Sequence, residues 1–195
     1  MKTTDIAKIR KNLEKELDNK RYEHTLAVAY TATSLAMRYN CNLNDAFVAG
    51  LLHDCAKCIS DSKKISICEK HKIQISDVER RNPSLLHGKV GAFLAMEEYN
   101  VDNDDIINAI SFHTTGRPGM SLLEKIIFVA DYIEPGRNKA LNLNEIRALA
   151  FMDLDKALLR ILEDTLLYLE NSEDEIDECT QITYIYYKSN VGKES

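Results

Sequence analysis

Residues 51–58 read LLHDCAKC and place an adjacent histidine and aspartate, His53 and Asp54, at the end of an apolar run from Phe47 to Leu52. Such a run predicts a buried helix, whose surroundings are costly for a carboxylate. Coordination to a metal cation would balance the charge of Asp54 and use its lone pairs. Successive helix positions lie about 100° apart, so the two side chains diverge, but a cation between them could contact both. The doublet therefore indicates a metal site.

A helical periodicity of hydrophobic residues continues through most of the chain. The expected helices cover residues 6–17, 22–39, 45–57, 61–72, 85–99, 103–115, 122–133, a short stretch from 144, and 154–170. No solenoid-length repeat and no linker rich in Gly, Ser or Pro divides the sequence. The sequence therefore predicts an all-α fold of about eight to nine helices, one domain over residues 1–195 with its core at about 20–165.

Local sequence signals set helix boundaries and packing within this pattern. Ser121 and Glu124 form a capping-box pattern at the start of one helix, and Asp102 is expected to cap another. Gly88 and Gly91 lie inside a predicted helix, where each costs about 1 kcal/mol relative to Ala. We expect these glycines to allow a neighbouring backbone to approach closely.

The C-terminal tail, residues 171–195, gives a weaker signal. Its acidic stretch SEDEIDE is expected to be solvated. The stretch TQITYIYY that follows is rich in β-branched and aromatic residues, so it is compatible with a strand, a helix or a partner-contact segment.

The composition limits the classes of partner. The formal net charge is −6, whereas a footprint on a nucleic acid polymer needs a clustered excess of Lys and Arg. The net charge does not exclude a small anionic ligand, because such a site needs only a few local cations, with or without a metal. No apolar run approaches the roughly 20 residues of a membrane helix, and the first residues lack the apolar stretch of a secretory signal. We therefore expect a cytoplasmic protein with no nucleic acid polymer and no membrane as a partner.

The five cysteines are an odd number without a paired framework, which favours reduced thiols over disulfides. Cys55 and Cys58 form the spacing C-x-x-C. A structural zinc site needs a second such pair or a Cys/His pair, and the sequence offers neither. Ordinary core and surface cysteines are therefore the favoured interpretation.

Further candidate ligands lie on other predicted helices. His24 is on the apolar side of the second helix, and Asp131 interrupts the apolar stretch IIFVADYI. With the doublet they give two imidazoles and two carboxylates, a mixed set suited to iron, manganese or zinc. Lys57, one helical turn beyond His53, can meet an anion near the metal.

Each of these residues has a plainer interpretation when taken alone. A single His on an apolar helix face is more often a satisfied core residue, and a lone Asp at a helix end is usually a cap. Lys57 and Arg137 would individually be solvated side chains more often than ligand contacts. The conjunction favours a site: His24, the doublet, His87, His113 and Asp131 each stand on the inward side or at the end of a separate predicted helix.

Five sequence motifs resemble those of a known family: RYEHTLAVA, GLLHDCAK, LLHGKVGA, ISFHTTGRPGM and ADYIEPGR. They resemble the HD-domain metal-dependent phosphohydrolases, an all-helical superfamily named after its His-Asp doublet, and within it the YqeK-type branch. That branch comprises bacterial symmetrical diadenosine tetraphosphate hydrolases. The resemblance covers about residues 20–165. Members of the branch commonly end in a segment like TxxARN, which residues 183–187 match only loosely.

The resemblance implies a role for each site residue. It implies one divalent metal ion, with iron expected and manganese or zinc as alternatives. The implied metal ligands are His24, His53, Asp54 and Asp131. The implied substrate contacts are His24, Lys57, His87, His113, Thr114, Asp131 and Arg137. The implied catalytic residues are Asp54, Lys57, His87 and His113.

The activity implied by the resemblance is cleavage of diadenosine tetraphosphate into two ADP. Because the metal site does not read the base, one alternative is another HD phosphohydrolase acting on nucleoside monophosphates, deoxynucleotides or guanosine alarmones. A non-catalytic nucleotide-binding protein is a second alternative. His87 and His113 also match the extra ligands of two-metal HD enzymes, although the resemblance favours one metal. A homodimer is a family expectation.

Overall fold

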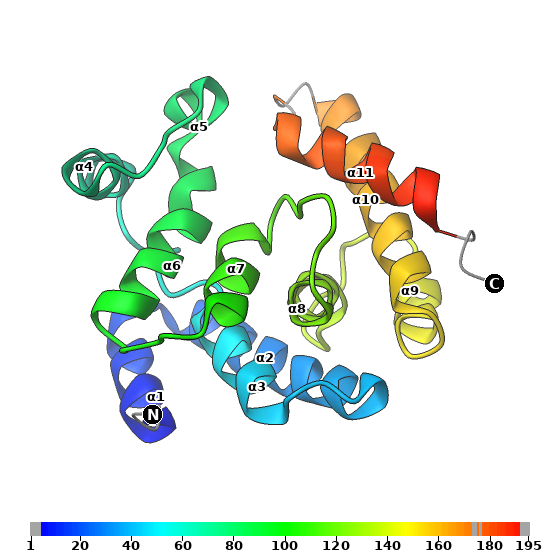
Figure 1. Ribbon diagram of the computed structural model, residues 1–195, viewed down its shortest axis with the longest axis horizontal. Coiled ribbons are helices and arrows are strands. Elements are labelled where there is room, and N and C mark those ends of the chain that lie inside the picture. The colour runs from blue at the N-terminus through cyan, green and yellow to red at the C-terminus, as the bar shows by residue number, and fades with distance from the viewer. Residues whose placement is uncertain (1–4, 173–174, 176, 192–195) are drawn as a thin grey trace.

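The computed structural model describes residues 5–172, 175 and 177–191, and within that part of the chain every regular element is a helix (Figure 1). In chain order the elements are α1 (Ile6–Glu16), α2 (Asn19–Tyr39), α3 (Leu43–Leu52), α4 (Asp61–His71), α5 (Asp77–Arg81), the 3-10 helix η1 (Pro83–Leu86), α6 (His87–Glu97), α7 (Asp104–Phe112), α8 (Leu122–Ile133), α9 (Leu143–Ala150), α10 (Leu154–Ser172) and α11 (Glu178–Asn190). The prediction of an all-α fold is confirmed.

The expected number of eight to nine helices is wrong, since the described residues form eleven α-helices. The two additional helices are α5 and α11. With five residues, α5 is too short to show a hydrophobic period. In α11 the β-branched and aromatic residues weaken helix propensity, but Thr183 and Tyr187 are buried and the helix packs against α10. Packing therefore overrides propensity there. Residues 173, 174 and 176 of the acidic stretch lie outside the described residues.

The helix predicted over 45–57 is wrong at its C-terminal end, because α3 stops at Leu52. Beyond it the backbone closes tighter turns: the N–H of Cys55 donates to the carbonyl of Leu52 at 3.1 Å, and that of Lys57 donates to the carbonyl of Asp54 at 2.9 Å. These three-residue steps replace the four-residue steps of an α-helix. The His-Asp doublet therefore lies on a turn at the helix end, with His53 as the C-cap residue.

Helix α8 occupies the middle of the fold (Figure 1), where it contacts α2, α3, α7, α9 and α10. Its sequence is apolar on nearly every side, as expected for a central helix. The largest fully buried side chains of the described core are Ile9, Leu13, Leu35, Leu51, Leu52, Leu86, Ile110, Leu123, Ile126, Ile127, Ile146 and Leu158. A second, smaller cluster lies between α4, η1 and α6 and consists of Ala56, Cys68, Leu86 and Val90.

Capping explains where several helices begin. The predicted capping box at α8 is confirmed: the Glu124 N–H donates to Ser121 Oγ at 3.1 Å, and the Ser121 N–H donates to Glu124 Oε2 at 2.7 Å. The cap predicted at Asp102 is wrong. Asn103 caps α7 instead, since its Oδ1 accepts the Asp105 N–H at 2.9 Å. The short amide side chain one residue later competes successfully for the free N–H groups of the first turn.

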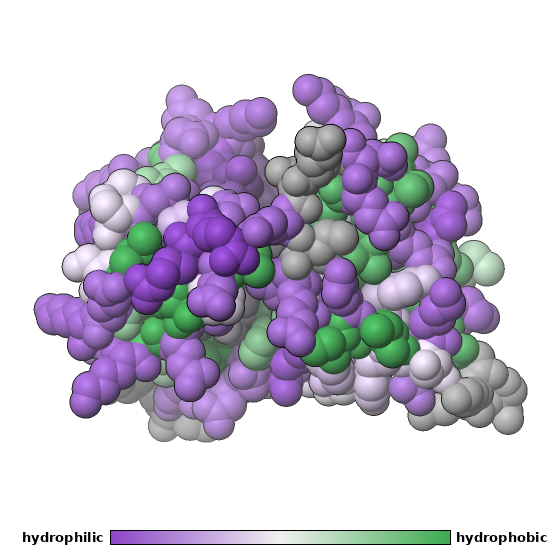
Figure 2. Space-filling view, turned by 90° about the horizontal axis from the view of Figure 1, so that it is seen from above, coloured by the Kyte–Doolittle hydropathy of each residue, from purple (hydrophilic) through white to green (hydrophobic). Residues whose placement is uncertain are grey.

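Hydrophilic side chains dominate the face seen in Figure 2, and the apolar side chains there form separate patches. None of the described helices combines the length and the apolar character needed to cross a membrane.

Candidate metal centre

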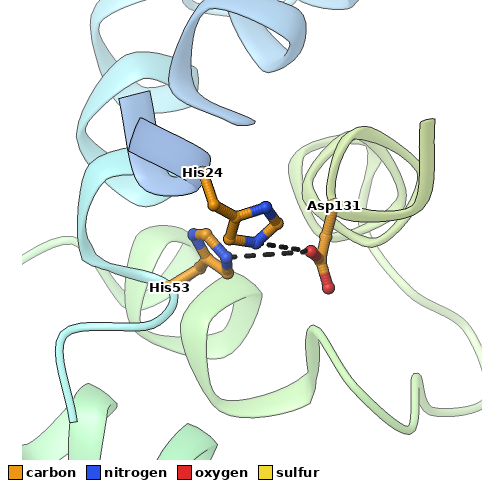
Figure 3. Close-up of side chains that lie close together, drawn as sticks. All are labelled: His24, His53 and Asp131. Atoms are coloured by element: carbon orange, nitrogen blue, oxygen red, sulfur yellow. Dashed lines mark ion pairs between the residues drawn. The ribbon is translucent and has the colours of Figure 1, made fainter. Parts of the chain in front are cut away.

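Six side chains from five helices converge at one place because each lies at or near a helix end. His24 comes from the N-terminal part of α2, and Asp131 comes from the last turn of α8. The doublet follows α3, as described above. His87 opens α6, and His113 is the C-cap residue of α7. Figure 3 shows His24, His53 and Asp131 pointing toward one another from three separate segments.

The four residues expected to be metal ligands lie within a few ångströms of one another. His24 Nε2 is 3.0 Å from Asp131 Oδ1, and His53 Nε2 is 3.9 Å from the same oxygen (Figure 3). Asp54 Oδ2 is 3.7 Å from His24 Nε2 and 3.5 Å from His53 Nε2. The structure therefore brings together all four predicted ligands, from positions as far apart as 24 and 131.

Each imidazole is oriented by its other ring nitrogen. His53 Nδ1 lies 2.7 Å from the carbonyl of Gly50, and His113 Nδ1 lies 2.7 Å from the carbonyl of Ile110. His87 Nδ1 lies 2.6 Å from the Ser84 carbonyl. A carbonyl oxygen only accepts, so Nδ1 carries the proton in each ring. In His53 this leaves the Nε2 lone pair facing the cluster.

The donor atoms fit a bound cation. His24 Nε2, His53 Nε2 and Asp54 Oδ1 are buried, and none of them forms a hydrogen bond with a described residue. Buried polar atoms without a partner are rare and costly, and coordination to a metal would satisfy all three. Two sets of donor atoms in the described chain are spaced closely enough to hold an ion: His24, His53 and Asp131, and His53, Asp54 and His113. Imidazole and carboxylate donors suit a transition metal.

The carboxylates are held in their charged form. Burial alone would raise the pKa of Asp54, but the nearby imidazoles of His53 and His113 outweigh it and hold that pKa far below its usual value. Burial likewise opposes ionisation of Asp131, yet its contacts with His24 and His53 lower its pKa as well. Two ionised carboxylates in a largely buried site supply the negative charge that a cation requires.

A second group of side chains surrounds His87, whose Nε2 atom is a common contact point. His113 Nε2 lies 3.1 Å away, and Lys57 Nζ and Thr114 Oγ1 each lie 3.3 Å away. Asp54 Oδ1 also lies 3.3 Å away, so this group adjoins the residues expected to be metal ligands. Burial, followed by the neighbouring His113 and Lys57, lowers the pKa of His87 to about 3. The ring is therefore neutral near pH 7.

Arg137, which the resemblance implies as a substrate contact, lies beside the expected metal ligand Asp131. Its Nη2 donates to Asp131 Oδ1 at 2.8 Å, and its Nε donates to the Asp131 carbonyl at 3.1 Å. The side chain is 43% exposed, so part of the guanidinium remains open to solvent or a ligand. All predicted site residues thus lie in one region, and Thr114 is the most peripheral of those around His87, since it is exposed.

Two residues of the site were missed by the sequence reasoning. Arg21 Nη1 donates to Asp54 Oδ2 at 2.5 Å, and Glu134 Oε1 lies 3.2 Å from His24 Nδ1. Arg21 stands three residues before His24, so it follows the same helix face, and that spacing could have revealed it. Glu134 is in the quoted string ADYIEPGR, but nothing in the sequence pairs it with a histidine 110 positions away.

The cysteines of the C-x-x-C pair lie in different surroundings. Cys55 is buried, and its thiol donates to the Gly91 carbonyl at 3.6 Å. Burial raises the pKa of this thiol well above its ordinary value. Cys58 is exposed and contacts Asp18 Oδ2 at 3.5 Å. Neither belongs to a group of described residues spaced for a metal ion.

Comparison with known proteins agrees with this geometry. Residues 21–136 match the HD domain family model. The chain is 40% identical to "Bis(5'-nucleosyl)-tetraphosphatase, symmetrical" of Bacillus subtilis, over 88% of this chain and 91% of that protein. It is 36% identical to the protein of that name in Staphylococcus aureus, over 85% of each chain.

A solved structure from Clostridium acetobutylicum resembles the fold closely. It is described as a predicted HD superfamily hydrolase involved in NAD metabolism, and it matches with a TM-score of 0.92 and 43% identity over 95% of this chain and 97% of that chain. The matched family segment contains His24, both residues of the doublet, and Asp131. The chain therefore belongs to the HD-domain family, in the branch that contains the bacterial symmetrical tetraphosphatases.

Proposed function

We propose that this protein is a metal-dependent phosphohydrolase that cleaves diadenosine tetraphosphate symmetrically into two ADP. The observation that supports it best is the set of buried donor atoms on His24, His53 and Asp54 that form no hydrogen bond with a described residue, beside the group of polar side chains around His87. The relatives with 36–40% identity are named for the same symmetrical activity.

In this proposal one divalent ion, with iron expected and manganese or zinc as alternatives, is held by His24, His53, Asp54 and Asp131. When bound, such an ion polarises a phosphoryl oxygen and makes a water molecule acidic enough to act as a nucleophile near neutral pH. The protein contributes the orientation of the ligands: Glu134 fixes the His24 ring through Nδ1, and the Gly50 carbonyl fixes the His53 ring. Both rings then present Nε2 to the ion.

The reaction requires attack on one of the two central phosphorus atoms. The water oxygen forms a bond to that phosphorus, the P–O bond of the central anhydride breaks, and the departing bridge oxygen leaves as the terminal oxygen of ADP. The other half, having gained the water oxygen, is also ADP. Asp54 Oδ1 is proposed to orient the water, because it is buried, forms no hydrogen bond with a described residue, and faces His87 and His113 at 3.3 and 3.6 Å.

Charge develops on the phosphoryl oxygens and on the departing oxygen. Lys57 and Arg137 are proposed to offset this charge, and Thr114 Oγ is available as a hydrogen-bond partner for a phosphate oxygen. One imidazole of the pair His87 and His113 is proposed to give a proton to the departing oxygen. The His87 ring is neutral near pH 7 and holds its proton on Nδ1. Burial opposes protonation of His113, but its contact with Asp54 raises the pKa of that ring above its usual value, so His113 is the ring that can carry the additional proton, with its Nε2 3.1 Å from that of His87.

The test is product analysis with metal-reconstituted protein and diadenosine tetraphosphate. We expect two ADP per substrate, separated by chromatography, whereas ATP plus AMP would contradict symmetrical cleavage. A panel of nucleoside monophosphates, deoxynucleotides and guanosine alarmones tests the wider HD-phosphohydrolase alternative. Metal loading without turnover of any of them would favour a nucleotide-binding role without catalysis.

The fifth histidine of the chain supplies a matched control. His71 is exposed on α4. His53→Ala is expected to lose bound metal and turnover, whereas His71→Ala is expected to keep both. A metal-to-protein ratio near one supports the single-ion proposal. A ratio near two, with one ion lost in His87→Ala, would require the two-metal arrangement instead.

The proposal also includes the cellular location and the oligomeric state of the protein. A nucleotide substrate made inside the cell implies a cytoplasmic enzyme, and the family resemblance implies a homodimer. Fractionation of cells and sedimentation of the purified protein would test these two points separately.

A further inference from the structure

A cavity of about 940 Å³ opens beside the metal centre and is not used by the mechanism above. It lies between the start of α2, the segment after α8, and the second half of α10. Small-molecule sites in proteins usually measure roughly 300–1,000 Å³, so the volume is large enough for a nucleoside. We call it the α2–α10 cavity.

The α2–α10 cavity is continuous with the metal centre. Its lining includes His24, whose Nε2 faces Asp131, and Arg21, which pairs with Asp54. Arg137 and Glu134 line it as well. None of Lys57, His87, His113 and Thr114 contributes to its wall. The cavity therefore reaches the centre from a side different from that of the His87 group.

The cavity wall carries four basic side chains and three carboxylates, Glu23, Glu134 and Asp164. Two of the carboxylates are already engaged, because Glu134 contacts His24 and Asp164 accepts a hydrogen bond from Asn142. Arg21 and Arg137 stand at the end near the metal ligands, and Lys20 and Lys139 lie further along the wall. Among the residues that the structure describes, neither lysine ammonium makes an ion pair. Ammonium groups without a carboxylate partner are available to an anionic ligand.

The wall also carries two tyrosines. Tyr132 is partly buried, and its hydroxyl donates to the Leu141 carbonyl at 3.2 Å. Tyr168 is 63% exposed and carries no resolved hydrogen bond to a described residue. An exposed aromatic ring beside free cations can stack on a nucleobase without reading its identity.

We propose that the α2–α10 cavity binds the second nucleoside-diphosphate half of the dinucleoside tetraphosphate, an inference that rests on the proposed function. Cleavage at the central anhydride leaves two equal halves, so each must extend from the reacting phosphorus in its own direction. One half contacts the His87 group. The other passes Arg21 and Arg137, and its nucleoside lies along Tyr168 and Lys139.

The experiment compares diadenosine tetraphosphate with adenosine 5'-tetraphosphate, which has the same phosphate chain but one nucleoside. A single nucleoside can use whichever subsite is intact, so only the dinucleotide needs both. For Tyr168→Ala we expect the ratio of the two kcat/KM values, dinucleotide over mononucleotide, to fall about five- to a hundredfold, the loss typical of one stacked base. Tyr168→Phe, which keeps the ring, should restore the ratio.

Tyr30→Ala is the matched control, because Tyr30 is similarly exposed, at 55%, and does not line the cavity. Equal losses with both substrates in Tyr168→Ala, or no loss with either, would overturn the proposal.

Calorimetric titration of diadenosine tetraphosphate into Asp54→Asn separates this inference from the proposed function. If the wild-type protein hydrolyses neither substrate, the proposed function fails. Weaker binding when Tyr168→Ala is added to that variant would still support the cavity as a nucleoside site, and unchanged binding would overturn it.

Discussion

Replacement of Gly88 by alanine is expected to separate the two helices that carry His87 and His113. A Cβ atom on Gly88 would lie 2.6 Å from the carbonyl oxygen of Ser111 on α7, where ordinary contacts begin at 3.4 Å. The obstacle is backbone, so α6 and α7 must move apart. Overpacking of this kind costs about 1–3 kcal/mol, and the better helix propensity of alanine returns up to about 1 kcal/mol.

The expected net loss is therefore about 0–3 kcal/mol, and each kcal/mol corresponds to a decrease in Tm of about 2–4 °C for a chain of this size. The effect on turnover should be larger. The Nε2 atoms of His87 and His113 lie 3.1 Å apart, and a displacement of about 1 Å at an active site can lower the rate about 10²-fold. Thermal unfolding and steady-state turnover of the metal-loaded variant measure the two quantities.

Gly91, one helical turn further along α6, gives the control. A Cβ atom added at Gly91 would lie closest to the ends of two side chains, 3.3 Å from Ile110 Cγ2 and 3.4 Å from Cys55 Sγ. Gly91→Ala should therefore keep its activity and have an unchanged or slightly higher Tm. A Gly88→Ala protein with wild-type Tm and turnover would refute the idea that this helix contact sets the site geometry.

Three further perturbations test the surroundings of the metal ligands. Arg21→Ala leaves the buried Asp54 carboxylate without its guanidinium partner, so in chelator we expect a loss of about 1–3 kcal/mol, measured by thermal unfolding; added metal should reduce the loss. Glu134→Gln weakens the contact that orients His24, so metal affinity, measured by competition with a chromophoric chelator, should fall about 10–100-fold. Burial lowers the pKa of His53 from 6.5 to about 4, so the unfolded chain binds a proton that the folded chain does not; without metal, the free energy of unfolding should decrease as the pH falls from 6.5 toward 4.

For each of these three predictions, a specific result would contradict the expected role of the residue. Equal destabilisation of Arg21→Ala with and without metal would mean that no cation replaces the guanidinium at Asp54. Unchanged metal affinity in Glu134→Gln would remove its proposed positioning role. In the pH series, His53→Gln should flatten the dependence measured by chemical denaturation, and an unaltered slope would point to other titrating groups.

The sequence predicted the helices best where their signals are local. The capping box of Ser121 and Glu124 and the amphipathic pattern of α10 depend on residues within a few positions of one another, so they are readable without a fold. The end of α3 could not be predicted from local sequence, because the periodicity of hydrophobic residues does not distinguish a helix from the tighter turns that follow Leu52.

The sequence by itself determined that polar groups of high desolvation cost, His24, the doublet and Asp131, stand in apolar helical surroundings, which is a property of each segment alone. Only the tertiary structure decided which atoms meet. Arg21 with Asp54, Glu134 with His24, and the α2–α10 cavity all arise from the way helix ends pack around α8. Such contacts join positions 33 to 110 residues apart, and no local pattern encodes them, because their energy depends on the packing of whole helices.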